Sequence, residues 1–325
     1  MTGFCTLFDS AYLSRGLLLY DSLKRHIPEF HLYIFAFDTL SDTILRKLNL
    51  SEVTVISLSE FENEKLLAVK SSRNRAEYCW TCTSSVVDYV LRKYGLLSCT
   101  YLDADLFFYD SPEILLGELR NGKKILITEH RYSWPATIFE QKRAGRFCVQ
   151  FITFSNDIES LRVLEKWRDQ CIDWCYARYE DGKFGDQKYL DSWPVEYPNV
   201  HVLENQGGGV APWNARQYKF RKSGEKIIGK RKWSAEEFNI VFFHFHFVRG
   251  RKDGNTDLGW NRLTSNTIEL FYIPYLRMLE EKERFLEAEF TDYTRRTFDT
   301  VGTGMKEKIK NLFKELTGYN IINAE

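Results

Sequence analysis

Over the first hundred residues, short apolar runs alternate with longer amphipathic stretches, and this alternation constrains the fold more than any other feature of the chain. The apolar runs have the length of strands, and the stretches between them repeat apolar residues at helical spacing. The predicted strands are Phe4–Phe8, His31–Phe37, Val53–Leu58 and Cys99–Leu102. The predicted helices are Leu13–His26, Asp42–Leu48 and residues 76–94. This β-α-β-α order predicts an α/β fold with a parallel, doubly wound sheet that has helices on both faces.

The order loosens after residue 110, and the pattern becomes wholly helical from Ile268 onward. The elements predicted between these points are a short helix at Pro112–Leu119, a longer helix at about Asp157–Arg178, and strands at Ile125–Thr128, Val149–Phe154, Val200–Leu203 and Val241–Val248. A basic stretch runs from Arg216 to Lys232, where eight Lys or Arg face Glu225 alone. Two interpretations stay open for it: a solvated hairpin, or an electropositive rim that faces a phosphorylated substrate.

Charge and cysteine content exclude several classes of protein. The 45 Lys and Arg are balanced by 45 Asp and Glu, so the whole chain is no polycation and we expect no nucleic-acid partner. No apolar run reaches the roughly 18 residues of a membrane span, and the first residues lack the pattern of a signal peptide, so we expect a cytoplasmic protein. The seven cysteines are odd in number and are interpreted as reduced core thiols. The alternative is a zinc site formed by Cys79, Cys82, Cys171 and Cys175.

A basic amphipathic helix is predicted near the C-terminus. Its apolar positions, which include Ile309, Leu312 and Leu316, line one face, and lysines occupy the rest. The commoner use of such a face is docking onto the protein's own core or onto a second copy in a homodimer. The alternative is peripheral contact of residues 303–317 with the inner face of an anionic membrane.

The most informative segment for function is the strand Cys99–Leu102 with the Asp103-Ala-Asp105 that follows it. An Asp-x-Asp at the end of an apolar strand places two carboxylates on the same side of the chain. They lie at the carboxyl edge of the sheet, where open α/β sheets bind their ligands. Two oxygen donors there suit Mg²⁺ or Mn²⁺ with positions left for a diphosphate. The alternative is that the pair forms only a turn or a helix cap.

Two histidines in Val241–Val248 strengthen the metal interpretation. In a strand, His244 and His246 fall on one face and the phenylalanines on the other. Two imidazoles on one face need hydrogen-bond partners or a metal. One imidazole together with two carboxylates forms a mixed site compatible with Mn²⁺ or Mg²⁺ rather than a structural zinc cage.

Two further clusters carry polar or aromatic side chains. After the turn at Gly185, Asp186 and Gln187 either cap a short helix or lie against a sugar ring. The glycine run 207–209 is followed by Trp213 and Asn214. Glycines let the backbone approach a ligand closely and tryptophan stacks on sugar faces, whereas the plain alternative is a surface turn packed by the tryptophan.

Several strings in order from about residue 4 to residue 250 resemble one group of enzymes, the bacterial GT-A-fold, nucleotide-sugar-dependent glycosyltransferases of surface polysaccharide and lipopolysaccharide assembly. The strings are Thr6-Leu-Phe-Asp9-Ser-x-Tyr12, Glu77-Tyr-x-Trp80-Thr, Tyr101-Leu-Asp-Ala-Asp105, Gly185-Asp-Gln-Lys-Tyr-Leu190, Ala211-Pro-Trp-Asn214 and Phe242-Phe-His-Phe245. The resemblance implies a Rossmann-like mixed sheet flanked by helices. It also implies a GT-A catalytic domain at 1–255, with a donor half at about 1–110 and an acceptor half at about 111–255, and a C-terminal helical extension at 256–325.

The resemblance also implies roles for single residues. Asp103, Asp105 and His244 would hold Mn²⁺ or Mg²⁺, with His246 as the second choice of histidine. Asp186 and Gln187 would flank the anomeric carbon of the sugar. The residues implied to bind the donor are Phe8, Asp9, Tyr12, Arg15, Arg75, Asp103, Trp213, Asn214, Arg249 and Lys252. The implied reaction moves a hexose from a nucleotide-diphosphate sugar, a UDP-sugar, to a glycan or glycolipid acceptor with retention of configuration.

The chain departs from the group at two points. The related galactosyl- and glucosyltransferases follow the metal histidine with Gly and then Lys-Pro-Trp, whereas basic residues at 249, 251 and 252 follow here and would have to hold the diphosphate. Cys148 stands where many relatives have Asn, which puts the acceptor-side contact in doubt.

Two other functions are alternatives for this sequence. Haloacid-dehalogenase-type phosphatases also use Asp-x-Asp, but near the N-terminus and followed by Thr or Val, whereas Leu106 follows here. A catalytically inactive nucleotide-sugar- or glycan-binding protein is the other alternative. Metal-dependent release of free nucleoside diphosphate would distinguish an enzyme from such a binding protein.

Overall fold

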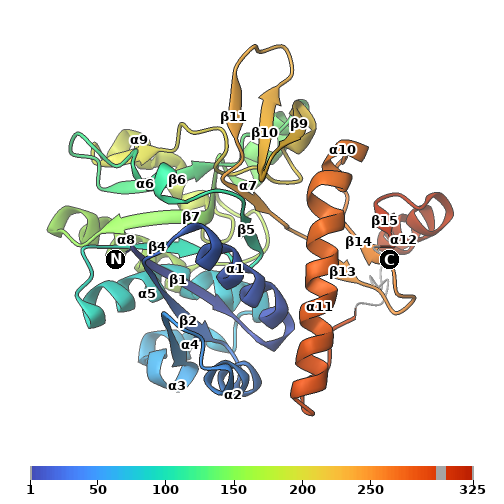
Figure 1. The fold of residues 1–325 in the computed structure, drawn as a ribbon. Helices are drawn as coiled ribbons and strands as arrows, with labels where there is room; N and C mark the ends of the chain where they lie inside the picture. Colours follow the sequence, from blue (N-terminus) through green and yellow to red (C-terminus); the bar gives the residue numbers. More distant parts are fainter. Residues whose placement is uncertain (1, 298–304, 324–325) are drawn as a thin grey trace.

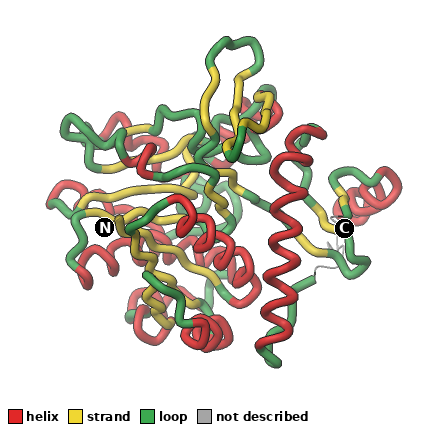
Figure 2. Tube along the Cα trace, in the orientation of Figure 1, coloured by secondary structure: helices red, strands yellow, loops and turns green. Residues whose placement is uncertain are grey.

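The computed structural model describes residues 2–297 and 305–323, and its centre is a seven-stranded sheet (Figures 1 and 2). The strands of the chain are β1 (Thr2–Phe8), β2 (Phe30–Ala36), β3 (Val53–Ser57), β4 (Ser98–Leu102), β5 (Leu106–Phe108), β6 (Ile125–Glu129), β7 (Phe147–Ser155), β8 (Val200–Val202), β9 (Tyr218–Ser223), β10 (Lys226–Arg231), β11 (Glu237–Asn239), β12 (Phe242–His244), β13 (Arg249–Gly250), β14 (Thr256–Asp257) and β15 (Ile321–Ile322). The helices are α1 (Leu13–His26), α2 (Thr39–Leu48), α3 (Leu58–Phe61), α4 (Glu64–Lys70), α5 (Arg75–Tyr94), α6 (Glu113–Leu116), α7 (Ala136–Ala144), α8 (Ile158–Asp173), α9 (Trp193–Glu196), α10 (Ser265–Thr267), α11 (Ile273–Glu289) and α12 (Met305–Thr317).

The order of strands in the sheet is β3-β2-β1-β4-β7-β6-β8. The first four neighbours are parallel to one another, as the β-α-β-α order predicts. Strand β7 is antiparallel to both β4 and β6, and β8 is parallel to β6. The predicted α/β class, with a mixed sheet flanked by helices and a C-terminal helical extension, is therefore confirmed.

Helices cover the two faces of the sheet through two separate apolar clusters. One cluster joins α5 and α8 to one face, with Val86 and Trp167 fully buried in it. The other joins α1 and α2 to the opposite face. Helix α1 lies close to β1 because Gly16 has no side chain: a Cβ there would lie 2.3 Å from the ring of Phe8. The packing holds the carboxyl ends of β1 and β4 at one edge of the sheet.

Several predicted elements are shorter in the structure, among them the helix expected at Pro112–Leu119, which spans only Glu113–Leu116. The strand expected at Val241–Val248 pairs only over β12, which lies antiparallel to β5. It ends there because the backbone turns, and Phe247 has a φ of 64°. The helix expected up to Arg178 ends at Asp173, where Trp174 takes an extended conformation as the C-cap.

The C-terminal segment packs on the start of the chain. Helix α11 lies alongside α1 (Figure 1). The Ser14 hydroxyl donates to a Glu283 oxygen at 2.5 Å, and Lys282 pairs with Asp21 at 2.7 Å. The expectation of a wholly helical segment beyond Ile268 is wrong in one respect, because β15 pairs with β14. The expected domain boundary after residue 255 falls in the turn between β13 and β14, which pair with each other.

Helix α12 does not bury its apolar face in the protein's own core. Ile309 is 61% exposed and Leu316 is 77% exposed. Lys314 is instead the side chain that faces inward, where it pairs with Asp257 and donates to the Gly259 carbonyl at 2.8 Å. The expected docking of this face onto the core is therefore wrong. Residues 303 and 304 of the predicted membrane-contacting segment lie outside the described residues, and no helix in the described part is long and apolar enough to cross a membrane.

The basic stretch 216–232 forms an antiparallel hairpin of β9 and β10, which β11 extends (Figure 1, top). The hairpin prediction is confirmed, and its exposed side chains are mostly basic. All seven cysteines are free. Among the described residues, two groups have the spacing of metal ligands, and neither contains the cysteines at 79, 82, 171 and 175.

Candidate functional site

Asp103, Asp105 and His244 meet where β4 ends. The Asp103 N–H donates to the Gln150 carbonyl at 3.0 Å, and the chain then turns, with the Leu106 N–H donating to the Asp103 carbonyl at 3.2 Å. Strand β5 follows and pairs with β12, so that His244 lies opposite Leu106. The sheet edge and this second pairing thus join two segments that are more than a hundred residues apart in the sequence.

The ligand atoms converge on the His244 ring. Its Nε2 lies 3.0 Å from an Asp105 oxygen and 3.8 Å from an Asp103 oxygen. Two overlapping groups have ligand atoms within 4.8 Å of one another: Asp103 with Cys148 and His244, and Asp105 with His244 and His246. The structure therefore brings together the three residues that the resemblance implied as ligands, with His246 close by, and His244 is common to both groups.

The electrostatics of this cluster are dominated by one ion pair. Burial raises the pKa of Asp105, but the charge and hydrogen bond of His244 outweigh burial and hold that pKa well below its usual value. Burial lowers the pKa of His244, and the Asp105 carboxylate outweighs it, so the pKa of this imidazole is raised. Burial also raises the pKa of Asp103, against the opposing charge of His244. The two carboxylates thus stabilise positive charge on the His244 ring.

Gln150 was missed by the sequence analysis. It is fully buried on β7, and its Oε1 lies 2.6 Å from His244 Nδ1. Because a carbonyl oxygen can only accept, Nδ1 carries the hydrogen and Nε2 is the nitrogen that faces the carboxylates. The sequence does carry one signal for it, because Gln150 is a polar residue within an otherwise mostly apolar strand. The neighbouring Cys148 thiol has its pKa raised by burial, which keeps it protonated and a poor ligand.

Four of the predicted donor-binding residues lie together beyond the end of β1. Asp9 is buried, caps the turn Ser10–Tyr12 by accepting the Ala11 N–H at 2.9 Å, and pairs with Arg75. The Arg15 guanidinium lies 4.7 Å over the Tyr12 ring and donates to the Val248 carbonyl at 2.7 Å. This bond ties α1 to the segment that follows His244.

The other predicted donor-binding residues take different places. Phe8 is buried under α1, while Tyr12 is 38% exposed. The Arg249 guanidinium lies 3.9 Å over the Phe247 ring. Lys252 is exposed in the turn between β13 and β14.

Asp186 is buried, and its charge interacts with that of Asp103. Burial, and then the charge of Asp103, raises the pKa of Asp186 to about 7. The turn before it is confirmed, because Gly185 has a φ of 53°, and a short 3₁₀ helix follows at Lys188–Ser192. Gln187 is half-buried, and its Nε2 donates to the Ala144 carbonyl at 2.6 Å. Asp186 therefore acts on the carboxylate cluster through its charge, while the Gln187 amide nitrogen holds the end of α7.

Trp213 packs directly on the histidines. Its ring centroid lies 5.2 Å from that of His244 and 5.7 Å from that of His246, and its Nε1 donates to the His130 carbonyl at 2.9 Å. Asn214 is fully buried, and its amide bonds the backbone at His130, Gly209 and Ala211. The polar atoms of Asn214 therefore hold the loop rather than face a donor.

The backbone of the glycine run 207–209 packs closely against other parts of the protein. A Cβ at Gly207 would lie 1.9 Å from the Asn239 carbonyl oxygen, and one at Gly208 would lie 2.6 Å from a Leu203 methyl group. Gly209 has a φ of +92°. These glycines place the loop that carries Trp213, so the close approach predicted for a ligand is made by the chain.

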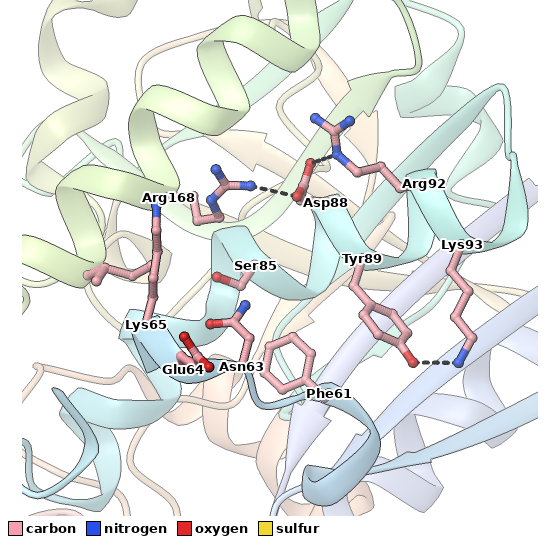
Figure 3. A pocket seen from close by; sticks show the side chains of 11 residues that line it. Phe61, Asn63, Glu64, Lys65, Ser85, Asp88, Tyr89, Arg92, Lys93 and Arg168 are labelled. Carbon is pink, nitrogen blue, oxygen red and sulfur yellow. Dashed lines mark hydrogen bonds and ion pairs between the residues drawn. The ribbon is translucent and has the colours of Figure 1, made fainter. Parts of the chain in front are cut away.

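A groove between α4, α5 and α8 lies outside this site (Figure 3). Two of its arginines share one acid: Asp88 bridges Arg92 and Arg168, at 2.7 Å to each. Lys93 donates to the Tyr89 hydroxyl at 2.5 Å. The groove is therefore crossed by a salt bridge between α5 and α8 that fixes two of its arginines.

Comparisons with known proteins give the following. No protein-family model matches the chain. It is 28% identical over 296 residues to the uncharacterized protein YfnD of Bacillus subtilis strain 168, an alignment that covers 89% of this chain and 92% of that protein. The structure of mouse xyloside xylosyltransferase 1 aligns at 15% identity and a TM-score of 0.46, covering 75% of this chain and 97% of that chain. Galactosyltransferase LgtC, solved with donor and acceptor sugar analogues, aligns at 13% identity and a TM-score of 0.44, covering 66% and 77%. These structural neighbours are glycosyltransferases.

Proposed function

We propose that the chain is a metal-dependent glycosyltransferase that moves a hexose from a nucleotide-diphosphate sugar, a UDP-sugar, to a glycan or glycolipid acceptor with retention of configuration. One observation carries the proposal: Asp103, Asp105 and His244 face one another at the carboxyl end of the central strand β4. Asp186 is buried, has a raised pKa and interacts with the charge of Asp103. Paired carboxylates and an imidazole at such an edge suit the handling of a diphosphate through a divalent cation.

The residues present fit Mn²⁺ or Mg²⁺. The donor set has two carboxylates and one imidazole, and Gln150 fixes the ring so that Nε2 faces the acids. A set of hard oxygen donors with one nitrogen favours these ions over zinc. Asp103, Asp105 and His244 would hold the ion, with His246 as the alternative nitrogen. When bound, the ion supplies Lewis-acid stabilisation of the negative charge on the leaving diphosphate.

The residues beyond β1 are suited to the nucleotide. The Tyr12 ring is partly exposed, and the Arg15 guanidinium lies over one of its faces. Arg75 pairs with both Asp9, which follows β1, and Asp38, which follows β2, and so fixes the two carboxylates at neighbouring strand ends. We assign these residues to the base and ribose, and Arg249 and Lys252 to the diphosphate, where their positive charges stabilise the leaving group.

Asp186 is assigned to the sugar. An oxocarbenium-like sugar carries positive charge, which a buried carboxylate next to C1 stabilises more strongly in apolar surroundings than in water. Gln187 would position the ring through its Oε1, since its Nε2 is held by Ala144. The exposed part of Trp213 offers an aromatic face to the donor sugar or the acceptor.

The test is donor hydrolysis, in which nucleoside diphosphate is released from a panel of nucleotide sugars with and without Mn²⁺. We expect release with at least one donor, loss in EDTA, and loss in Asp105→Ala. Asp110→Ala is the matched control, because Asp110 is a carboxylate that pairs with Lys226 and lies outside the cluster. Wild-type turnover in EDTA or in Asp105→Ala would overturn the metal role. Tight binding of a nucleotide sugar without any release would favour a non-catalytic binding protein.

A further inference from the structure

A second cleft, of about 610 Å³, opens next to the candidate metal centre. Its walls are the segment 131–137 in front of and within α7 and the base of the basic hairpin, at residues 216–218 and 231–233. The hairpin projects from the body of the molecule at the top of Figure 1. None of the residues assigned above to metal or donor lines this cleft.

The cleft is one layer of side chains away from the metal centre. The Ser133 N–H donates to the Trp213 carbonyl at 3.1 Å, and the Trp213 ring packs against His244. Tyr132, which lines the cleft, stacks on His130 with ring centroids 4.5 Å apart. His130 in turn contacts Trp213 edge to face at 5.2 Å. A ligand bound in the cleft would therefore lie behind Trp213, on the side opposite the histidine cluster.

The cleft carries positive charge that the protein does not neutralise. Arg131, Arg216, Arg231 and Lys232 line it, and within residues 2–297 and 305–323 none of them forms an ion pair with a carboxylate. The hydrogen bonds of Arg131, Arg216 and Lys232 go to backbone carbonyls, which fix the cations without cancelling their charge. The acid in the lining, Glu129, is paired with Arg146. In the groove of Figure 3, by contrast, Arg92 and Arg168 are both paired with Asp88.

Polar and aromatic groups complete the cleft. Ser133 is 4% exposed, and its hydroxyl has no hydrogen-bond partner among the described residues, which leaves a buried polar group for a ligand to satisfy. Trp134 is 75% exposed and Trp233 is fully exposed beside the cations. Large exposed aromatic rings next to unpaired cations suit a ligand that has both sugar faces and negative charges.

We propose that this cleft binds the acceptor, and that the acceptor is an anionic glycan whose phosphodiester or carboxylate groups contact Arg231, Lys232 and Arg216. This proposal rests on the proposed glycosyltransferase function and deepens it, because it gives that function an acceptor class and a binding place one layer of side chains from the metal centre. A neutral glycan would leave the cations unpaired and would gain only the aromatic contacts. The basic hairpin is thus the part of the chain that selects the acceptor class.

The test measures binding of three oligomers of equal length to the full chain: glycerol-phosphate hexamer, galacturonate hexamer and maltohexaose. Two variants are compared, Arg231→Gln/Lys232→Gln in the cleft and Lys219→Gln/Lys222→Gln on the same hairpin but outside the cleft lining. Both remove two positive charges, so an effect of net charge alone would be equal in them. Thermal unfolding of each variant confirms that it is folded.

We expect at least one anionic hexamer to bind about tenfold more tightly than maltohexaose at low salt and to lose that advantage as salt rises. The cleft variant should lose about tenfold in affinity, and the control less than about twofold. Preference for only one hexamer would identify phosphodiester or carboxylate as the source of the charge. Equal binding of all three oligomers, or equal loss in both variants, would overturn the proposal. Donor hydrolysis by the wild type in the same preparation separates the two claims: hydrolysis without anionic preference refutes the acceptor class alone, and anionic binding without hydrolysis refutes the transferase.

Discussion

Replacing Gln150 with leucine should separate metal affinity from stability. Gln150 is fully buried and accepts the His244 Nδ1–H at 2.6 Å, while its own Nε2 finds no partner among the described residues. Leucine has a similar size and no polar atom. The change therefore removes the group that fixes the ring of His244 without opening a large cavity.

The magnitudes follow from this one hydrogen bond and from the unpaired Nε2. Leaving the buried Nδ1–H unpaired costs about 1–3 kcal/mol, and removing the unpaired Nε2 returns a similar amount, so the free energy of unfolding should change by less than about 1 kcal/mol. Partners of this kind tune metal ligands by about 10–100-fold, which corresponds to about 1.4–2.7 kcal/mol of binding free energy. We expect Mn²⁺ affinity to fall by that factor while stability hardly changes.

Electron paramagnetic resonance of free Mn²⁺ measures the affinity, and urea unfolding in EDTA measures the stability. The matched control is Thr153→Val, also on β7, which removes a buried hydrogen bond of 2.9 Å to Thr100 without touching His244. The control should lose about 1–3 kcal/mol of stability and keep its Mn²⁺ affinity. If Gln150→Leu binds Mn²⁺ as tightly as the wild type, Gln150 does not orient the ligand and the reasoning fails.

Three further predictions concern other parts of the chain. Gly207→Ala should lower the free energy of unfolding by about 1–3 kcal/mol in urea titrations, because its Cβ would lie 1.9 Å from a carbonyl oxygen, whereas Gly250→Ala, with nothing within 4 Å, should change it by less than about 0.5 kcal/mol; equal effects would contradict the close approach. Burial raises the pKa of Asp38, but hydrogen bonds from Ser10 and Ser41 outweigh it and lower that pKa. Asp38→Ala should therefore cost about 1 kcal/mol at pH 7, and the difference from the wild type should shrink as the pH falls below about 4; a difference that grows in acid would refute this sign. Deleting residues 303–325 should abolish co-sedimentation with anionic liposomes if the exposed apolar face of α12 contacts a membrane, and unchanged co-sedimentation would remove that idea.

Elements with a strong local signal could be predicted from the sequence. The helix Leu13–His26 is found with the bounds expected, because its apolar spacing and flanking residues determine it locally. The parallel strands β1 to β4 were predictable for the same reason. The antiparallel placement of β7 was not, because it depends on which strand the chain pairs with after a long connection.

The candidate site shows the same division. The convergence of Asp103, Asp105 and His244 could be predicted, since the two aspartates directly follow one apolar strand and the histidine lies in another. The role of Gln150 could not, because a single polar residue in a strand does not reveal what lies across the sheet. The exposed apolar face of α12 could not be predicted either. The helix buries Lys314, which pairs with Asp257, and leaves its apolar side chains exposed.

Anomalous diffraction at the manganese edge, from crystals grown with Mn²⁺ and a uridine nucleotide, tests the central claim most directly. We expect one strong peak within about 2.2 Å of carboxylate oxygens of Asp103 and Asp105 and of Nε2 of His244. A manganese peak elsewhere in the protein, or the lack of a peak at these three side chains at saturating Mn²⁺, would contradict the account.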